Sequence, residues 1–157
     1  MTFQILDNFL KEDDFKFIKD NTMCYNFPLH YANEVNENDN HNFYFEHNFY
    51  YQTEKTDQFP IIHNLLNALG LKSLIRAKLN CFPRTENLIV YGKHADYEFP
   101  HKGAILYLNT CNGGTYIKDD FIESKENRLL LFDSSNYHAS TNCTDQKCRY
   151  NININYF

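Results

Sequence analysis

The segment 148–156, next to the C-terminal Phe157, alternates strictly between two kinds of side chain. Successive residues of a β-strand point to opposite faces of a sheet, so an alternating run has two different faces. Such a strand, with one apolar and one polar face, fits a small barrel or sandwich whose interior is a polar cavity able to hold a ligand. The apolar face carries Tyr150, Ile152, Ile154 and Tyr156, and the polar face carries Arg149, Asn151, Asn153 and Asn155.

Most of the second half of the chain has the same β-rich character. Its short segments are rich in β-branched and aromatic residues and are separated by turn residues, which is typical of strands. We therefore expect strands at residues 76–82, 88–93, 104–108, 114–117, 128–132 and 137–140.

The first half mixes both kinds of element. Apolar spacing predicts helices over residues 10–20 and 60–69, the second of which is followed by Gly70 as a stop signal. Residues 3–6 and 43–51 are predicted to be strands, and the polar, Asn-rich residues 32–42 a loop. A chain of 157 residues without a linker or an internal repeat is expected to form one domain, 1–157.

Three residues of this chain have the types that bind a metal ion. His94 and Asp96 lie two positions apart, so on an extended segment both side chains leave the same face. His138 would join them from a neighbouring strand. Two histidines and one carboxylate bind non-haem Fe(II) on one side and leave its other positions open, whereas a fourth protein ligand would close a structural zinc site. The alternative is an exposed His-X-Asp and an unrelated strand histidine.

From about Arg76 to Phe157 the chain carries several short signatures in a fixed order. Through them it resembles the 2-oxoglutarate/Fe(II)-dependent oxygenases, and within these the prolyl 4-hydroxylase-like branch. The signatures are Tyr91-Gly92-Lys93-His94-Ala95-Asp96, Ile105-Leu106-Tyr107-Leu108-Asn109, Gly113-Gly114-Thr115, Asn127-Arg128-Leu129-Leu130-Leu131-Phe132, His138 and Arg149.

The resemblance implies a mainly β fold with flanking helices. Residues 76–157 would form a double-stranded β-helix core (a jelly roll, cupin-like), and residues 1–75 would supply helices packed on one of its sheets. Gly113 and Gly114 would form a turn that needs positive φ or a close backbone approach.

The resemblance also assigns the co-substrate site. Arg149 would grip the distal carboxylate of 2-oxoglutarate through its forked donors. Tyr107 would help to bind the same carboxylate through its hydroxyl. Independently of the resemblance, Asn151 shares the strand face of Arg149 and is a candidate for a further hydrogen bond. The alternatives are a surface Arg149 paired with Asp145 and a Tyr107 that serves only the core.

Two more residues are candidates for contact with the substrate. Tyr91 matches a family position near the metal, although strand packing would explain it equally well. His101 lies in the segment after the metal motif. The remaining histidines are expected to be exposed or to cap elements, except that His47 is expected to be a hydrogen-bonded packing residue.

The implied enzyme is a dioxygenase that uses Fe(II), O₂ and 2-oxoglutarate to hydroxylate a C–H bond and forms succinate and CO₂. Ascorbate is a candidate reductant. A carboxylate at position 96 favours hydroxylation over halogenation, because halogenating relatives have a small residue there. The expected substrate is a protein or peptide side chain, with proline favoured. The alternatives are a free amino acid or another small metabolite, and a non-catalytic metal-binding jelly-roll protein.

The amino-acid composition limits which kinds of molecule the protein is expected to bind and where it is expected to occur. The formal net charge is −5 and no Lys/Arg stripe stands out, so nucleic-acid substrates are disfavoured. No apolar run approaches membrane-spanning length, and Asp7 interrupts any signal-peptide core. Five cysteines, an odd number without CxxC spacing, are expected to be free thiols in a reducing cytoplasm. The Asn, Lys, Ile, Tyr and Phe bias suits an AT-rich genome such as that of a bacteriophage, which would place the protein in the host cytoplasm.

Overall fold

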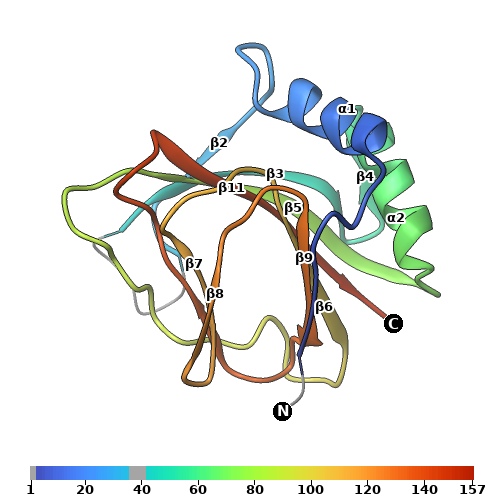
Figure 1. Cartoon of the computed structure of the whole chain (residues 1–157). Helices are drawn as coiled ribbons and strands as arrows, with labels where there is room; N and C mark the ends of the chain where they lie inside the picture. The colour runs from blue at the N-terminus through green and yellow to red at the C-terminus, as the bar shows by residue number, and fades with distance from the viewer. Residues whose placement is uncertain (1–2, 36–41) are drawn as a thin grey trace.

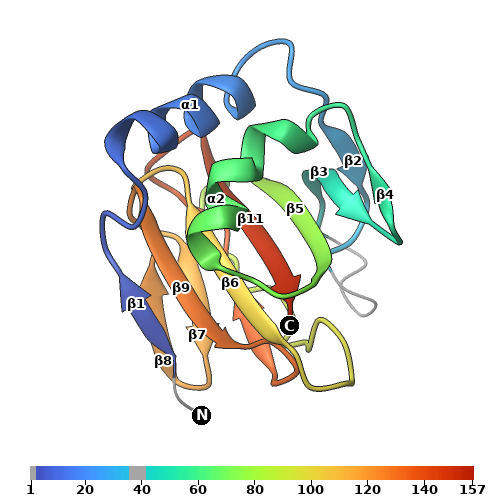
Figure 2. The ribbon, with the colours of Figure 1, turned by 90° about the vertical axis from the view of Figure 1, so that its right-hand side faces the viewer.

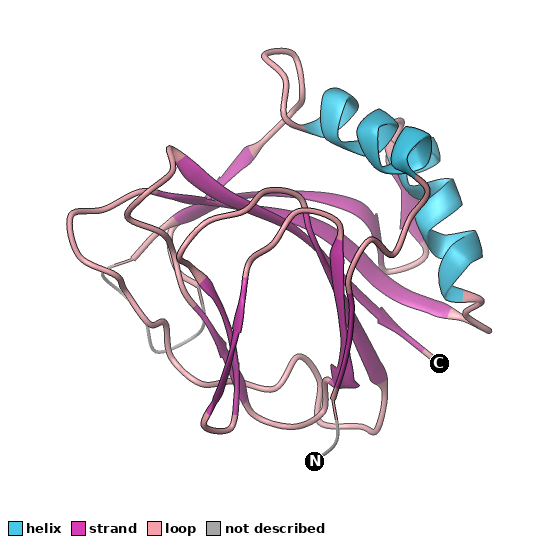
Figure 3. Cartoon of the chain, viewed as in Figure 1, coloured by secondary structure: helices cyan, strands magenta, loops and turns pink. Residues whose placement is uncertain are grey.

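The computed structural model describes residues 3–35 and 42–157. Their fold is mainly β, with short helices confined to the first half of the chain (Figure 1; Figure 3). The helical elements are α1 (Glu12–Thr22), the 3₁₀ turn η1 (Phe59–Ile62) and α2 (His63–Leu69). The strands are β1 (Gln4–Leu6), β2 (His30–Ala32), β3 (Tyr44–Tyr51), β4 (Glu54–Lys55), β5 (Leu74–Pro83), β6 (Lys102–Tyr107), β7 (Gly114–Ile117), β8 (Asp120–Glu123), β9 (Arg128–Asp133), β10 (His138–Ser140) and β11 (Cys148–Tyr156).

Two antiparallel sheets form the jelly roll that the sequence led us to expect. The larger has the order β1-β9-β6-β11-β5-β3-β2, with β4 on the edge of β3, and the smaller has the order β10-β7-β8. Figure 1 looks into the space between them, with β7 and β8 on one side and β5, β6, β9 and β11 on the other. Strand β11 lies in the middle of the larger sheet and pairs with β5 along its whole length.

The helices cover the outer face of the larger sheet (Figure 2). Phe15 and Ile18 of α1 and Leu65 of α2 belong to one buried cluster with Ile152 and Ile154 of β11. This burial explains why short helices are stable here, since an isolated helix of eleven residues or fewer is marginal in water. In the part of the chain that the structure describes, no helix is long and apolar enough to cross a membrane.

Most predicted elements are present with shifted ends. The helix expected over residues 10–20 begins at Glu12, and the one expected over 60–69 is a 3₁₀ turn followed by α2. It ends at Gly70 as predicted, with a left-handed φ of 60°. In the expected loop 32–42, Ala32 belongs to β2, and residues 36–41 lie outside the described part of the chain.

One predicted strand is wrong. Residues 88–93 form no strand and contribute to a single isolated bridge, between Val90 and Thr141, followed by another between His94 and His138. The bridges join the segment to Thr141 and to His138 at the start of β10, and among the described residues no continuous ladder forms between these two points. Leu88 and Val90 are consequently exposed, and their apolar character misled the strand prediction.

The turn at Gly113 brings two backbone segments close together, as expected. A Cβ on Gly113 would lie 1.8 Å from the carbonyl oxygen of Asn142 and 2.9 Å from Cδ of Arg149. Because the nearer obstacle is backbone, no side-chain rotation could relieve the clash. The φ angle is not the reason for the glycine here, since the only glycine in the described residues with positive φ is Gly70.

We therefore predict that Gly113→Ala destabilises the protein far more than Gly70→Ala. At Gly70 a Cβ would meet nothing within 4 Å, so only the left-handed conformation opposes it, at about 1 kcal/mol. At Gly113 the cost is roughly 3 kcal/mol, because a backbone segment must shift. Urea unfolding of both variants measures the difference, and equal losses of stability would contradict the close approach.

Candidate metal and co-substrate site

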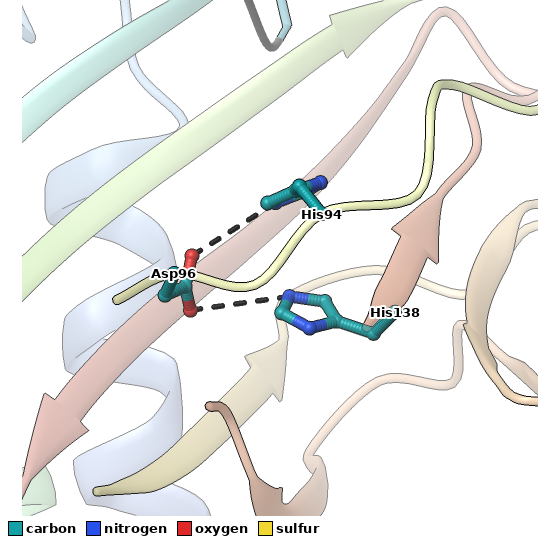
Figure 4. A group of neighbouring side chains, drawn as sticks. All are labelled: His94, Asp96 and His138. Atoms are coloured by element: carbon teal, nitrogen blue, oxygen red, sulfur yellow. Dashed lines mark ion pairs between the residues drawn. The ribbon is translucent and has the colours of Figure 1, made fainter. Parts of the chain in front are cut away.

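His94, Asp96 and His138 converge in space (Figure 4). The Nε2 atoms of His94 and His138 each lie 3.9 Å from a different carboxylate oxygen of Asp96. One ligand atom from each residue lies within 4.8 Å of the others. The two histidines are placed by reciprocal backbone hydrogen bonds, in which each amide donates to the other carbonyl at 2.9 Å. The bridge between His94 and His138 therefore brings the two rings together, and Asp96, at a bend two residues after His94, faces both of them.

The hydrogen bonds of the two rings leave the right nitrogen for a metal. Nδ1 of His94 lies 3.2 Å from the carbonyl of Gly92, and Nδ1 of His138 lies 3.0 Å from that of Asn136. A carbonyl can only accept, so Nδ1 carries the proton in both rings and Nε2 keeps its lone pair. Burial also lowers the pKa of His138, which favours the neutral, ligating form. The donor set and its tautomers fit Fe(II).

Asp96 is held in place by polar neighbours that the sequence did not reveal. Arg76 donates to Oδ1 at 2.8 Å, and Asn155 donates to Oδ2 at 2.8 Å. Ser134 also donates to Oδ2. Burial alone would raise the pKa of Asp96, but Arg76, the ring of His138 and these donors outweigh it and hold the pKa well below its usual range. Asp96 is therefore a fixed carboxylate at neutral pH.

A cavity of about 580 Å³ contains this ligand set. Its polar wall comes from β5 and β11, whose inward residues alternate with residues of the core under the helices, as predicted for β11. The residues that line it are Val35, Tyr44, Arg76, Lys78, Asn80, Phe82, Lys93, His94, Ala95, Asp96, Tyr97, Glu98, Ile105, Thr115, Tyr137, His138, Ser140, Arg149, Asn151 and Asn153.

Arg149 lines this cavity and is fully buried. Its Nη1 donates to the hydroxyl of Ser140 at 2.9 Å and to the carbonyl of Thr141 at 2.8 Å, and its Nη2 to the hydroxyl of Thr115 at 3.3 Å. Its Nε has no hydrogen-bond partner. Burial lowers its pKa from the ordinary value, although a guanidinium stays protonated at neutral pH.

No carboxylate within the described residues forms an ion pair with Arg149. The alternative of a surface arginine paired with Asp145 is wrong, because Asp145 instead accepts from the backbone amide of Asn112. A buried charge without a counter-ion is costly. An anion bound in the cavity would supply the missing counter-charge.

Of the other residues predicted to bind the co-substrate, Asn151 lines the cavity and Tyr107 does not. Asn151 accepts a hydrogen bond from Asn80 at 3.0 Å. Tyr107 is buried behind the wall, where its hydroxyl donates to Thr115 at 2.8 Å and its ring lies 5.5 Å from the Arg149 guanidinium carbon. It thus shares Thr115 with Arg149 as a partner.

Tyr91 and His101 are not among the residues that line the cavity. Tyr91 is buried and stacks on Phe82 at 5.3 Å between ring centroids. His101 is buried and accepts from Asn155 at 3.2 Å, which places it behind Asp96. A direct contact with substrate stays a prediction for both. His47, in contrast, is a hydrogen-bonded packing residue as expected.

Sequence reasoning missed the cavity residues of β5. Arg76, Lys78 and Asn80 alternate with the buried Ala77, Leu79 and Cys81. The signal was present, because the same two-faced pattern that singled out the last strand also runs through this one. It was overlooked because its polar residues are lysine and arginine, which exposed strands also carry.

A comparison with protein-family models and a comparison with curated proteins gave no match. Solved structures, in contrast, match over almost the whole chain. The fold is that of the 2-oxoglutarate/Fe(II)-dependent oxygenases. An oxidoreductase of that family from Burkholderia pseudomallei is 11% identical with a TM-score of 0.73, over 98% of this chain and 84% of its own.

Two other similar structures differ in the kind of molecule they handle. A prolyl hydroxylase from Trichoplax adhaerens, in complex with a peptide of hypoxia-inducible factor, is 17% identical with a TM-score of 0.68 over 99% of this chain and 83% of its own. SnoN, a non-haem α-ketoglutarate-dependent epimerase of nogalamycin biosynthesis, is 10% identical with a TM-score of 0.66 over 99% of this chain and 77% of its own.

We predict that Mn²⁺, a redox-inert stand-in for Fe(II), stabilises the protein through this site. At about one hundred times its Kd a ligand adds about 2.7 kcal/mol to the free energy of unfolding. His138→Ala should abolish the effect, whereas His63→Ala, which removes an exposed histidine of α2, should keep it. Thermal unfolding with and without Mn²⁺ measures both, and undiminished stabilisation of His138→Ala would refute the assignment.

Lowering the pH should reduce the stability of the protein through the hydrogen-bonded carboxylate of Asp96. The folded pKa of Asp96 is lowered, so its ionised form contributes stability above the unfolded pKa, and this contribution is lost as the pH falls below it. Between about pH 5 and about pH 3 the metal-free wild type should lose about 1 kcal/mol more than Asp96→Asn. Urea unfolding at both pH values tests this, and a constant difference between the two proteins would count against it.

Proposed function

We propose that this protein is a non-haem Fe(II)- and 2-oxoglutarate-dependent dioxygenase that hydroxylates a C–H bond. The observation that carries the proposal is the buried Arg149, which lacks a carboxylate partner among the described residues and lines the same cavity as His94, Asp96 and His138. A three-ligand metal set alone would also suit other metal proteins. A separate anion site beside it suits a co-substrate with two carboxylates.

2-Oxoglutarate fits this arrangement through both of its ends. Its distal carboxylate would pair with Arg149 and use the unpartnered Nε and the neighbouring hydroxyls of Ser140 and Thr115. Tyr107 would support this end from behind through Thr115. Asn151 could donate from the β11 wall to the same ligand. A forked, permanently charged donor in a buried site gives both affinity and orientation.

Iron held by His94, Asp96 and His138 would, with 2-oxoglutarate and O₂, supply the oxidising power for C–H hydroxylation, with succinate and CO₂ as the products of 2-oxoglutarate. The chain itself contributes geometry. His94 and His138 present Nε2 because their Nδ1 atoms are bonded to backbone carbonyls. Arg76, Ser134 and Asn155 fix the orientation of the Asp96 carboxylate. The residues of β11 that line the cavity would form the wall against which the co-substrate binds.

We infer that the substrate is a protein or peptide side chain, with proline favoured. The cavity wall includes Tyr137, a large and well-exposed aromatic residue beside His138, together with the charged Lys93 and Glu98. An exposed aromatic residue next to a metal site suits contact with a chain that extends over the surface. The prolyl hydroxylase from Trichoplax adhaerens, which has this fold, is in complex with a peptide fragment of hypoxia-inducible factor.

A small-molecule substrate is the second candidate. It is favoured by the volume of the cavity, about 580 Å³, which lies in the range of ligand pockets, and by the fold shared with SnoN. A non-catalytic metal-binding protein is disfavoured, because such a protein has no use for a buried arginine without a counter-ion.

Succinate release separates these candidates. The purified protein, with Fe(II), ascorbate and 2-oxoglutarate, would be tested against proline-containing peptides, free proline and other free amino acids. Peptide-dependent succinate and a peptide mass increase of one oxygen would support the first candidate. Turnover with free amino acids alone would support the second. The enzymatic proposal would be overturned if the folded, iron-loaded protein formed no succinate either with or without a substrate.

Arg149→Lys should weaken 2-oxoglutarate binding at least tenfold, about 1.4 kcal/mol, because lysine keeps the charge and loses the forked donor geometry. The matched control is Arg128→Lys, since Arg128 pairs with Asp7 at the surface and does not line the cavity. Calorimetric titration of 2-oxoglutarate into the Mn²⁺-loaded proteins measures affinity without turnover. Equal affinity in the two variants would remove Arg149 from the co-substrate site.

A further inference from the structure

A second group of metal-ligating side chains lies outside the cavity. Cys111, Cys143 and Asp145 each offer a ligand atom, and these atoms lie within 4.8 Å of one another. None of the three lines the cavity that holds His94 and His138. Cys111 lies between β6 and β7, and the other two lie between β10 and β11. The thiols are buried while Asp145 is exposed, so the group has an opening to solvent on the carboxylate side.

Hydrogen bonds fix the two loops where these ligands meet. The backbone amide of Asn112 donates to both carboxylate oxygens of Asp145 at 3.1 Å. The side chain of Asn112 donates to the Thr144 hydroxyl at 2.7 Å and accepts from the Thr144 amide at 2.9 Å. These contacts hold the residue after Cys111 against the residues after Cys143. The ligands are thus brought together by the backbone and do not depend on an ion to meet.

The donor types select a different ion from the one that suits His94, Asp96 and His138. Thiolates favour thiophilic ions such as Zn²⁺ over Mg²⁺, Ca²⁺ or Mn²⁺. Around a tetrahedral zinc with bonds of about 2.0–2.3 Å, ligand atoms stand roughly 3.3–3.8 Å apart. Small side-chain rotations bring three atoms already within 4.8 Å to that spacing. A water molecule could take the fourth position on the exposed side.

We propose that Cys111, Cys143 and Asp145 bind one thiophilic divalent cation of the Zn²⁺ type, separate from the iron site. Each thiol would release one proton as its metal–sulfur bond forms, and no electron is transferred. Proton release on binding is general for cysteine ligands.

The cation would reinforce the wall behind Arg149. It would join the loop that contains Gly113 to the loop that contains Asn142, whose backbones are already in close contact. The carbonyl of Thr141, in the second loop, accepts from Arg149 at 2.8 Å. The ion would thus stabilise the position of the guanidinium without touching the co-substrate. This structural role does not depend on the activity proposed above.

Co²⁺ titration of the reduced, full-length protein tests the site, because thiolate-to-Co²⁺ charge transfer absorbs in the near ultraviolet and the iron site has no thiolate. We expect a band that saturates at one equivalent of thiolate-bound Co²⁺ and that Zn²⁺ removes. Cys143→Ser should abolish it. Asp145→Asn, an exposed substitution that should leave the fold intact, should weaken Co²⁺ binding at least tenfold.

Two cysteine variants serve as controls. Cys24→Ser removes an exposed thiol, and Cys148→Ser removes a partly buried one outside the group, so both should keep the band. The proposal is overturned if the folded, reduced wild type gives no band, if Asp145→Asn binds Co²⁺ as the wild type does, or if the band follows Cys148 instead of Cys143. A Cys111–Cys143 disulfide in protein purified without oxidant, detected by mass spectrometry, would also overturn it.

Discussion

Strand β11 has an apolar face that packs against the core under the helices and a polar face that lines the cavity. The rest of the structure depends on keeping each face on its own side of the sheet. Ile152 and Ile154 pack under the helices, while Arg149, Asn151 and Asn153 line the cavity. A slip of one residue against β5 or β6 would exchange the faces and bury the polar set under the helices. The register of β11 is therefore fixed by the burial of its apolar face, and this register also places its polar residues in the cavity.

Among the described residues, the buried and half-buried cations that line the cavity are paired with a carboxylate, with one exception. Arg76 is paired with Asp96, and Lys78 donates to Glu46 at 2.8 Å. Arg149 is the buried cation left without a carboxylate among the described residues. Because Arg76 and Lys78 are already paired, Arg149 is the buried cation that an incoming anion would meet, whereas Lys93 lies exposed at the cavity wall. In the proposed function, this pairing would determine where the co-substrate carboxylate binds as well as how tightly it binds.

The sequence predicted the parts of the site that depend on local pattern. The alternation of β11 and the two-residue spacing of His94 and Asp96 need only the geometry of an extended chain. The family resemblance then supplied the jelly roll and the role proposed for Arg149. Long-range partners were beyond reach: nothing local in the sequence links Arg76 to Asp96 or Cys111 to Cys143. Strand β8 was missed because Asp120 and Glu123 are types depleted in strands, and only Ile122 is buried.

The central claim is that Arg149 and the three metal ligands form one site for iron and a 2-oxo acid. The most direct test adds Fe(II) and then 2-oxoglutarate to the metal-free protein without oxygen, and records the visible spectrum. A weak charge-transfer band that forms in the wild type and is lost in His138→Ala is the predicted result. Folded wild-type protein that binds Fe(II) and gives no band with 2-oxoglutarate would contradict the account.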